Sequence, residues 1–229
     1  MNRLSNISAF SSRLTISLLF LLVPAVVQAQ RDLKVERDSA ALFQGFALSV
    51  DLVGAAMMQF GDYGQYEGAL RINLRNKYFP IFELGYGKAD HETDPVTKIA
   101  YKTGAPYFRI GADVNILKNK QSGNRLFIGL RYAFTSYKVD ISRTPFDDPY
   151  WKWPTTFEVN DESCNQHWAE IVAGIDAKIA GPLHLGWNVR YKVRVSHNDG
   201  IMGTTWYVPG YGTQDTSNLG AQFNVIIDI

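Results

Sequence analysis

Strict alternation of apolar and polar residues is the feature that most constrains this sequence. It is clearest over residues 183–196, LHLGWNVRYKVRVS, where every second residue from Leu183 to Val195 is apolar and the residues between them are polar, charged or glycine. Successive side chains of a β-strand point to opposite faces, so this segment predicts a strand with one apolar and one polar face. Seven more segments follow the same rule: 44–58, 65–75, 79–89, 105–117, 125–139, 166–179 and 218–229.

The connections between these segments alternate in length. Short ones include 76–78, 118–124 and 181–182, and the long ones are 90–104, 140–165 and 197–217. Bacterial outer-membrane barrels have an even number of strands, short periplasmic turns and longer external loops. The sequence therefore predicts an all-β fold over residues 44–229, an eight-stranded antiparallel up-and-down transmembrane β-barrel, with ten strands as the alternative.

The polar face predicts which side of the wall looks inward. It carries seven acids and eight bases: Asp51, Glu67, Glu83, Asp113, Glu170, Asp176 and Asp228, with Arg71, Arg75, Arg109, Arg131, Lys178, Arg190, Lys192 and Arg194. Charges in a narrow lumen need partners, and near-balance meets that requirement. At eight strands the side chains fill the interior, which argues against a general porin. The apolar face is then expected to meet lipid.

Aromatic residues near the strand ends fit the same interpretation, because membrane barrels carry aromatic girdles at both interfaces. We assign Tyr66, Tyr86, Phe108 and Phe134 to the outer girdle, and Tyr78 and Phe79 to the inner one.

The N-terminal residues predict export. Arg3 and Arg13 precede and flank an apolar run over 14–27, which ends at a small-x-small site, Val27-Gln28-Ala29. This layout is typical of a signal peptide, which we place at 1–29, followed by a periplasmic leader at 30–43. Removing two of the 23 basic residues and none of the 22 acidic ones leaves 21 − 22 = −1. No basic patch suggests nucleic acid as a partner, and Cys164 is the only cysteine.

The last strand carries a recognisable pattern. Asn218 to Val225 reads polar, x, Gly, x, x, hydrophobic, x, hydrophobic, and it resembles the C-terminal assembly signal of outer-membrane barrels, although the chain ends on Ile229 rather than on an aromatic residue. The chain also resembles small uncharacterised outer-membrane barrels of the Bacteroidetes type. The resemblance includes strand sequences such as YFRIG at 107–111, which follows KTGAP at 102–106. The resemblance implies a Gram-negative outer-membrane location, contact with outer-membrane lipid and lipopolysaccharide, and recognition of the last strand by the barrel-assembly machinery. It implies no activity.

Three motifs are candidates for chemical sites. Residues 196–199, Ser-His-Asn-Asp, contain the residue types of a lipid A deacylase, but neighbouring strand residues face opposite ways, which favours a polar loop start. Residues 91–94, His-Glu-Thr-Asp, lack the ligand spacing of a cation site. His167 and Glu170 fall on opposite faces of a strand. The sequence thus predicts no catalytic residue, no metal and no cofactor.

Aromatic residues in two long loops are the candidate binding site: Tyr150, Trp151, Trp153, Trp206, Tyr207 and Tyr211. Exposed Trp and Tyr clusters mark recognition surfaces, although they can also plug a barrel mouth. We expect the loops 140–165 and 197–217 to form one cap with Trp151 and Trp206 at its centre. The predicted function is a monomeric surface-interaction barrel contacting lipopolysaccharide, glycan or a partner protein. The alternatives are a lipid A-modifying enzyme and a soluble periplasmic barrel of lipocalin type.

Overall fold

A computed structural model describes residues 41–91, 99–147, 154–203 and 205–229. The predicted signal peptide at 1–29 and nearly all of the leader at 30–43 lie outside these ranges. None of the described helices is long and apolar enough to cross a bilayer.

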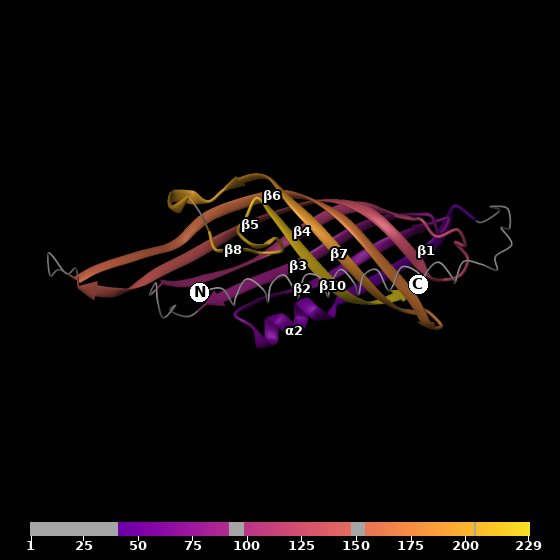
Figure 1. Ribbon diagram of the computed structural model, residues 1–229, viewed down its shortest axis with the longest axis horizontal. Helices are drawn as coiled ribbons and strands as arrows, with labels where there is room; N and C mark the ends of the chain where they lie inside the picture. The colour runs from indigo at the N-terminus through magenta and orange to yellow at the C-terminus, as the bar shows by residue number, and fades with distance from the viewer. Residues whose placement is uncertain (1–40, 92–98, 148–153, 204) are drawn as a thin grey trace, which may run out of the picture. The chain divides into compact units, whose positions relative to one another are not determined.

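Eight antiparallel strands close into a barrel, which confirms the eight-stranded prediction over the ten-stranded one. They are β1 (Phe43–Asp51), β2 (Tyr63–Leu74), β3 (Tyr78–His91), β4 (Ile99–Asn115), β5 (Arg125–Asp147), β6 (Pro154–Ala180), β7 (Leu183–Asn198) and β10 (Ser217–Asp228). Each strand pairs with its neighbours in the chain, and β1 pairs with β10 to close the ring, an up-and-down order (Figure 1). The segment between β7 and β10 holds a short 3₁₀ helix, η1 (Gly200–Met202), and a hairpin of β8 (Tyr207–Val208) and β9 (Gly212–Thr213).

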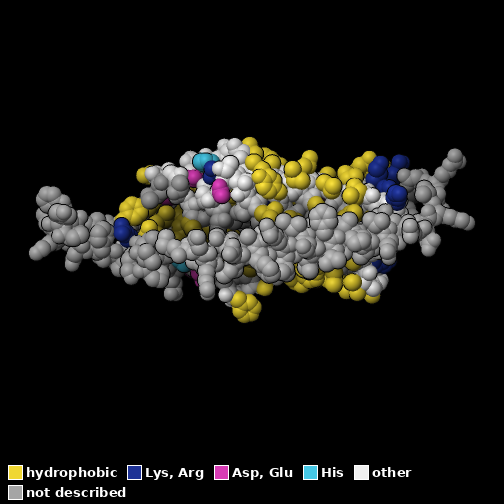
Figure 2. Space-filling view, viewed as in Figure 1, with side chains coloured by type: hydrophobic (Ala, Val, Ile, Leu, Met, Phe, Trp, Pro, Cys, Tyr) yellow, Lys and Arg dark blue, Asp and Glu magenta, His cyan; other side chains and the backbone are white. Residues whose placement is uncertain are grey.

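The predicted side-chain phase is confirmed. On β7, Trp187, Val189 and Tyr191 are exposed on the outside, whereas Arg190 and Lys192 are buried inside. Hydrophobic side chains accordingly gather on the outer surface of the wall (Figure 2). Such a surface is the reverse of a soluble barrel, which buries its apolar face.

One aromatic assignment is wrong. Phe79 is not part of a girdle but lies buried in the lumen, where its ring packs 5.1 Å from the Arg125 guanidinium. It follows the inward phase of β3, since Phe82 and Tyr86 are exposed on the other face. Tyr78 is exposed as predicted.

The predicted first strand, 44–58, is also wrong in its second half. β1 ends at Asp51, and residues 52–60 form the helix α2 (Leu52–Phe60). The Asp51 carboxylate accepts hydrogen bonds from the backbone N–H groups of Val53 and Gly54, both at 3.1 Å. An aspartate at this position stabilises a helix start. The following Ala and Met residues favour a helix.

The long loops predicted at 90–104 and 140–165 contain more strand than expected. β4 begins at Ile99, while β5 and β6 have 23 and 27 residues. A tilted strand needs only about 9–11 residues to cross a bilayer. We call the additional part the extension: residues 99–106 of β4, 136–147 of β5 and 154–166 of β6.

The polarity of β5 reverses where the extension begins. Below it, Leu130, Tyr132 and Phe134 point outward and are exposed. Above it, Tyr137 and Val139 point inward and are buried. The apolar residues therefore change from even to odd positions, and a rule that keeps one phase per strand ends the strand too early.

Candidate functional site

The lumen is filled by a continuous series of buried ion pairs. At its centre, Glu83 lies 2.6 Å from Arg190 and 3.0 Å from Arg131. Glu83 also lies 3.3 Å from Arg109, which in turn contacts Glu170 at 2.9 Å. All five side chains are at most 5 % exposed. In so dry an environment each charge depends on its partners.

The series continues toward the end with the short turns. Three further contacts extend it: Arg131 with Asp113 at 2.7 Å, Arg71 with Asp176 at 2.6 Å, and Arg125 with Asp228 at 2.5 Å. A cavity beside Glu67, Glu83 and Arg131 has a volume of about 10 Å³. That is room for about one water molecule, so the described side chains leave little open space here.

Residues 205–216, which we call the plug, fold back into the barrel mouth above these ion pairs. Arg109 donates to the carbonyl oxygen of Gly210 at 2.7 Å. Lys192 donates to the same oxygen at 2.8 Å and to the carbonyl oxygen of Tyr211 at 3.0 Å. Tyr101 Oη donates to the carbonyl oxygen of Tyr207 at 2.7 Å. The wall therefore holds the plug by its backbone.

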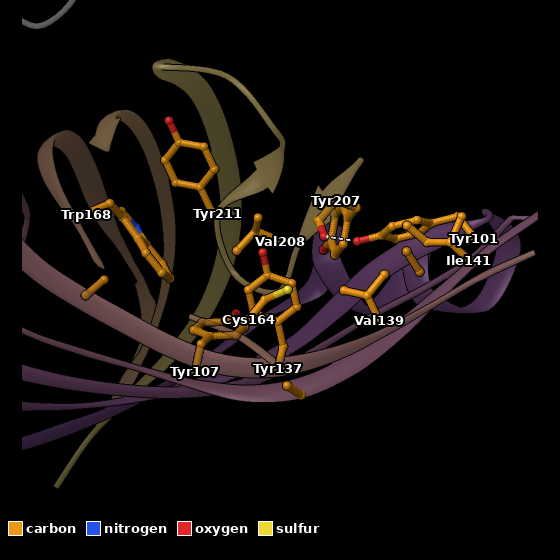
Figure 3. Close-up of a cluster of buried hydrophobic side chains, with 13 residues drawn as sticks. Tyr101, Tyr107, Tyr137, Val139, Ile141, Cys164, Trp168, Tyr207, Val208 and Tyr211 are labelled. Atoms are coloured by element: carbon orange, nitrogen blue, oxygen red, sulfur yellow. Dashed lines mark hydrogen bonds between the residues drawn. The ribbon is translucent and has the colours of Figure 1, made fainter. Parts of the chain in front are cut away.

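The plug and the inner face of the extension share a hydrophobic core (Figure 3). Its members from the plug are Tyr207, Val208 and Tyr211, and those from the extension include Tyr101, Tyr137, Val139, Ile141 and Cys164. Burial raises the pKa of the Tyr101 phenol, which therefore stays protonated and keeps its hydrogen bond to the plug. The mouth is closed by packing, whereas the lumen below it is closed by charge.

Trp206 lies at the surface of this mouth and is braced by rings from three other segments. Its ring centroid lies 5.2 Å from His91, 5.6 Å from Tyr101 and 5.9 Å from Tyr63. His91 is held in turn by Asp62, with 3.0 Å between Nδ1 and Oδ2. Trp206 remains 39 % exposed. We call Trp206, His91, Tyr101 and Tyr63 the aromatic platform.

A family model matches residues 10–228, almost the whole chain. The chain belongs to the DUF6048 family. That family is described as a domain of unknown function. No curated protein matches this DUF6048 chain.

Several solved structures are similar to this DUF6048 barrel in fold, and they are outer-membrane β-barrel proteins. Neisserial surface protein A is 10 % identical, with a TM-score of 0.43 over 82 % of this chain and 99 % of that one. A major outer membrane protein from Thermus thermophilus is 14 % identical, with a TM-score of 0.41 over 81 % and 98 %. The N-terminal β-barrel domain of Pseudomonas aeruginosa OprF is 10 % identical, with a TM-score of 0.36 over 82 % and 99 %.

The predicted binding residues of the DUF6048 chain divide into three groups. Tyr150, Trp151 and Trp153 lie outside the described residues, so a cap centred on Trp151 and Trp206 stays a prediction. Tyr207 and Tyr211 are not exposed loop tips, because both are buried in the plug. Trp206 keeps an exposed ring.

Two of the three candidate chemical motifs, 196–199 and the pair His167 and Glu170, lie in the described part of the chain and assemble no catalytic group there, whereas residues 92–94 of the third lie outside it. His197 Nδ1 lies 3.3 Å from Asp199, but no described hydrogen bond joins Ser196 to His197. His167 Nδ1 lies 3.0 Å from Tyr132 Oη on the outer surface, while Glu170 lies in the lumen. No group of three potential metal-ligating side chains occurs among the described residues.

Sequence reasoning misses three members of the platform. It places Tyr63 in a tight turn at 61–64, between the predicted strands 44–58 and 65–75, and Tyr101 in a long loop. It considers His91 only as a cation ligand. The signal available for Tyr101 is its inward phase, which it shares with Thr103 and Ala105. No local pattern connects these positions with Trp206, more than 100 residues later in the chain.

Proposed function

We propose that this protein is an outer-membrane barrel with a closed lumen, whose external mouth binds cell-surface carbohydrate by stacking on Trp206. The sugars of lipopolysaccharide are the carbohydrate nearest to such a mouth. One observation carries the binding proposal: Trp206 is partly exposed and fixed by neighbouring rings.

The location rests on the outer face of the wall. Leu84, Ile110, Leu130, Ile171 and Trp187 come from five adjacent strands, and each is about half exposed or more. Lipid would cover these side chains, and the apolar band of a membrane barrel has this arrangement. A lipocalin-type barrel needs an apolar interior for its ligand, and the ion pairs of this lumen argue against that alternative.

The closed lumen favours a role at the surface over one in conduction. An ion would have to break pairs such as Arg190 with Glu83 and displace the plug that Arg109 and Lys192 hold. Breaking a buried pair costs about 3–5 kcal/mol. The extension and plug therefore serve better as an external structure than as a gate.

The platform suits carbohydrate because its geometry exists before binding. Tyr63 and Tyr101 meet the Trp206 ring edge-on, at interplanar angles of 85° and 77°. A ring held in this way loses little conformational entropy when a ligand stacks on it, and preorganisation of this kind improves affinity. His91 and Asp62, at the rim, supply polar groups for sugar hydroxyls.

The binding test is calorimetry with the purified barrel and lipid-free oligosaccharide released from lipopolysaccharide. We expect Trp206→Ala to weaken binding at least tenfold. Trp187→Ala is the matched control. Trp187 is 67 % exposed on the wall, and it pairs with Phe223 in the half of β7 that follows the short turn, away from the mouth. No binding by the wild-type protein, or equal binding by both variants, would refute the proposal.

The location test is separate. The mature protein should fractionate with outer membranes, need detergent for extraction and migrate differently on a gel after heating, as a closed barrel does. Recovery of the protein in the soluble periplasm would contradict a membrane location.

A further inference from the structure

The barrel wall is not closed by strands along its whole height. β1 has nine residues, and it pairs with β10 only from Ala47–Asp228 to Asp51–Asn224. Beyond Asp51 the chain leaves the wall as α2. The outer half of β10, residues 217–223, therefore pairs with β7 alone among the described strands.

Among the described strands, none pairs with the β1-side backbone edge of this half of β10. Phe46 and Ile229 exchange two hydrogen bonds, at 2.9 Å and 2.7 Å, so odd-numbered residues of β10 direct their backbone groups toward the β1 side. By the alternation of an antiparallel ladder, Leu219, Ala221 and Phe223 have the same orientation. Open edges do not occur in contact with lipid tails unless they are buried in protein or line a polar cavity.

The helix α2 lies over this gap, but it packs closely against β2 rather than against β10. A Cβ atom at Gly64 of β2 would overlap the backbone nitrogen of Met58, and one at Gly54 would lie 2.7 Å from the carbonyl oxygen of Gln65. The close approach ties α2 to β2. Figure 1 shows α2 beside β2 and β10.

A crevice with a volume of about 260 Å³ remains between α2 and β10. Val53 and Met57 of α2 and Leu219 of β10 form its rim and are exposed to the lipid side. Lys192 and the plug residue Tyr211 form its floor. The crevice thus has an apolar entrance at the wall. Further inside it is lined by two cations, Lys192 and Arg190, and by the Asp51 carboxylate, which accepts the backbone hydrogen bonds at the start of α2.

Lys192 differs from the arginines of the lumen. Arg109 and Arg190 each contact three carboxylates. Lys192 is 7 % exposed and donates only to two neutral carbonyl oxygens, and among the described residues no carboxylate lies within 4.0 Å of its Nζ. Gly220, on the opposite strand, leaves the space beside the Lys192 side chain open. A buried cation without an ion pair favours an anion.

We propose that the crevice binds one long-chain carboxylate, with the carboxylate at Lys192 and the acyl chain passing between α2 and β10 toward the membrane. The apolar rim accommodates the acyl chain. The volume of the crevice lies just below the range of about 300–1,000 Å³ that is typical of pockets for larger ligands. A single chain therefore fits this space better than a two-chain lipid. The crevice shares Tyr63 with the platform, but Trp206 does not line it.

The test is native mass spectrometry of the full barrel, released at pH 8 from a neutral detergent in the presence of oleate or oleyl alcohol. We expect the wild-type protein to retain one oleate, and oleyl alcohol at least tenfold less. Gly220→Leu fills the crevice and should abolish retention. Ala112→Leu makes the same kind of change on the lipid-facing wall of β4 and should leave retention unchanged.

A third variant tests the cation. Lys192→Met should bind oleate no better than oleyl alcohol. If losing its hydrogen bonds to the plug prevents folding, judged by heat-modifiable migration, the Gly220 and Ala112 variants still decide the question. Equal retention of oleate and oleyl alcohol by the wild type, or retention by Gly220→Leu, would overturn the proposal. So would a wild-type dimer that Gly220→Leu abolishes, since a second copy would then cover the edge of β10.

Discussion

The two halves of β5 and β6 use opposite polarity on a continuous pair of strands. In the membrane-level half, Leu130 and Ile171 point outward, while Arg131 and Glu170 point into the lumen. In the extension, Lys138 is 64 % exposed on the outside, while inward side chains such as Tyr137 and Val139 belong to the hydrophobic core. The reversal shows that a strand's pattern records the solvent on each side of it. Lipid outside requires apolar residues there, and water outside does not.

The two halves are also held together by different forces. The lumen depends on pairs such as Glu83 with Arg190, in which each partner is buried. The mouth depends on apolar packing between the extension and the plug, with hydrogen bonds such as that of Tyr101 to Tyr207. Removing a charge and removing a methyl group or hydroxyl should therefore have very different consequences.

The largest effect is expected from Glu83→Ala. This substitution leaves Arg109, Arg131 and Arg190 without their shared partner, and breaking a buried pair costs about 3–5 kcal/mol. Urea unfolding of the barrel in phospholipid vesicles measures the loss. Glu158→Ala, at an exposed position of the extension, is the control and should change stability by less than about 0.5 kcal/mol. Equal losses would remove the distinction between the two halves.

A smaller effect is expected when a charge is added to the outer face. Val189→Arg places a cation against lipid and should destabilise the barrel by about 2–4 kcal/mol. Ser142→Arg adds the same side chain to the outer face of the extension, which meets water, and should be neutral within about 0.5 kcal/mol. The same unfolding assay compares them. A neutral Val189→Arg would show that the outer face of β7 does not meet lipid.

The membrane-level half could be predicted from the sequence, because lipid and lumen impose one unbroken alternation on strands such as 183–196. The extension could not, because the apolar phase moves from Phe134 to Tyr137 where the surroundings change. The alternation of Tyr137, Val139 and Ile141 indicates the strand, but recognising it requires that one strand may change its apolar phase. The helix start at Asp51 was also readable from the loss of alternation after it.

The partners within the lumen could not be read from the sequence, although the balance of charge could. Arg190 and Glu83 are 107 residues apart, and only the closure of the barrel brings them together. The platform has the same origin, since Tyr63, His91 and Trp206 come from distant segments. Their arrangement depends on how the plug folds back, which no local pattern specifies.

The smallest effect should appear at the mouth, where Cys164 reports on the plug. Its side chain is buried in the core shared with the plug, and burial raises the pKa of its thiol to about 11, so maleimide labelling should be slow. Tyr101→Phe removes one hydrogen bond to the plug, which is worth about 1 kcal/mol. Opening of the plug should become about fivefold more frequent, and Cys164 should be labelled about fivefold faster, while global stability falls by no more than about 1 kcal/mol. Tyr132→Phe removes a hydroxyl from the lipid-facing side and should leave the labelling rate unchanged. Equal rates in both variants would mean that the Tyr101 hydrogen bond does not hold the plug in place, and the mouth would then not depend on such bonds as the comparison of the two halves requires.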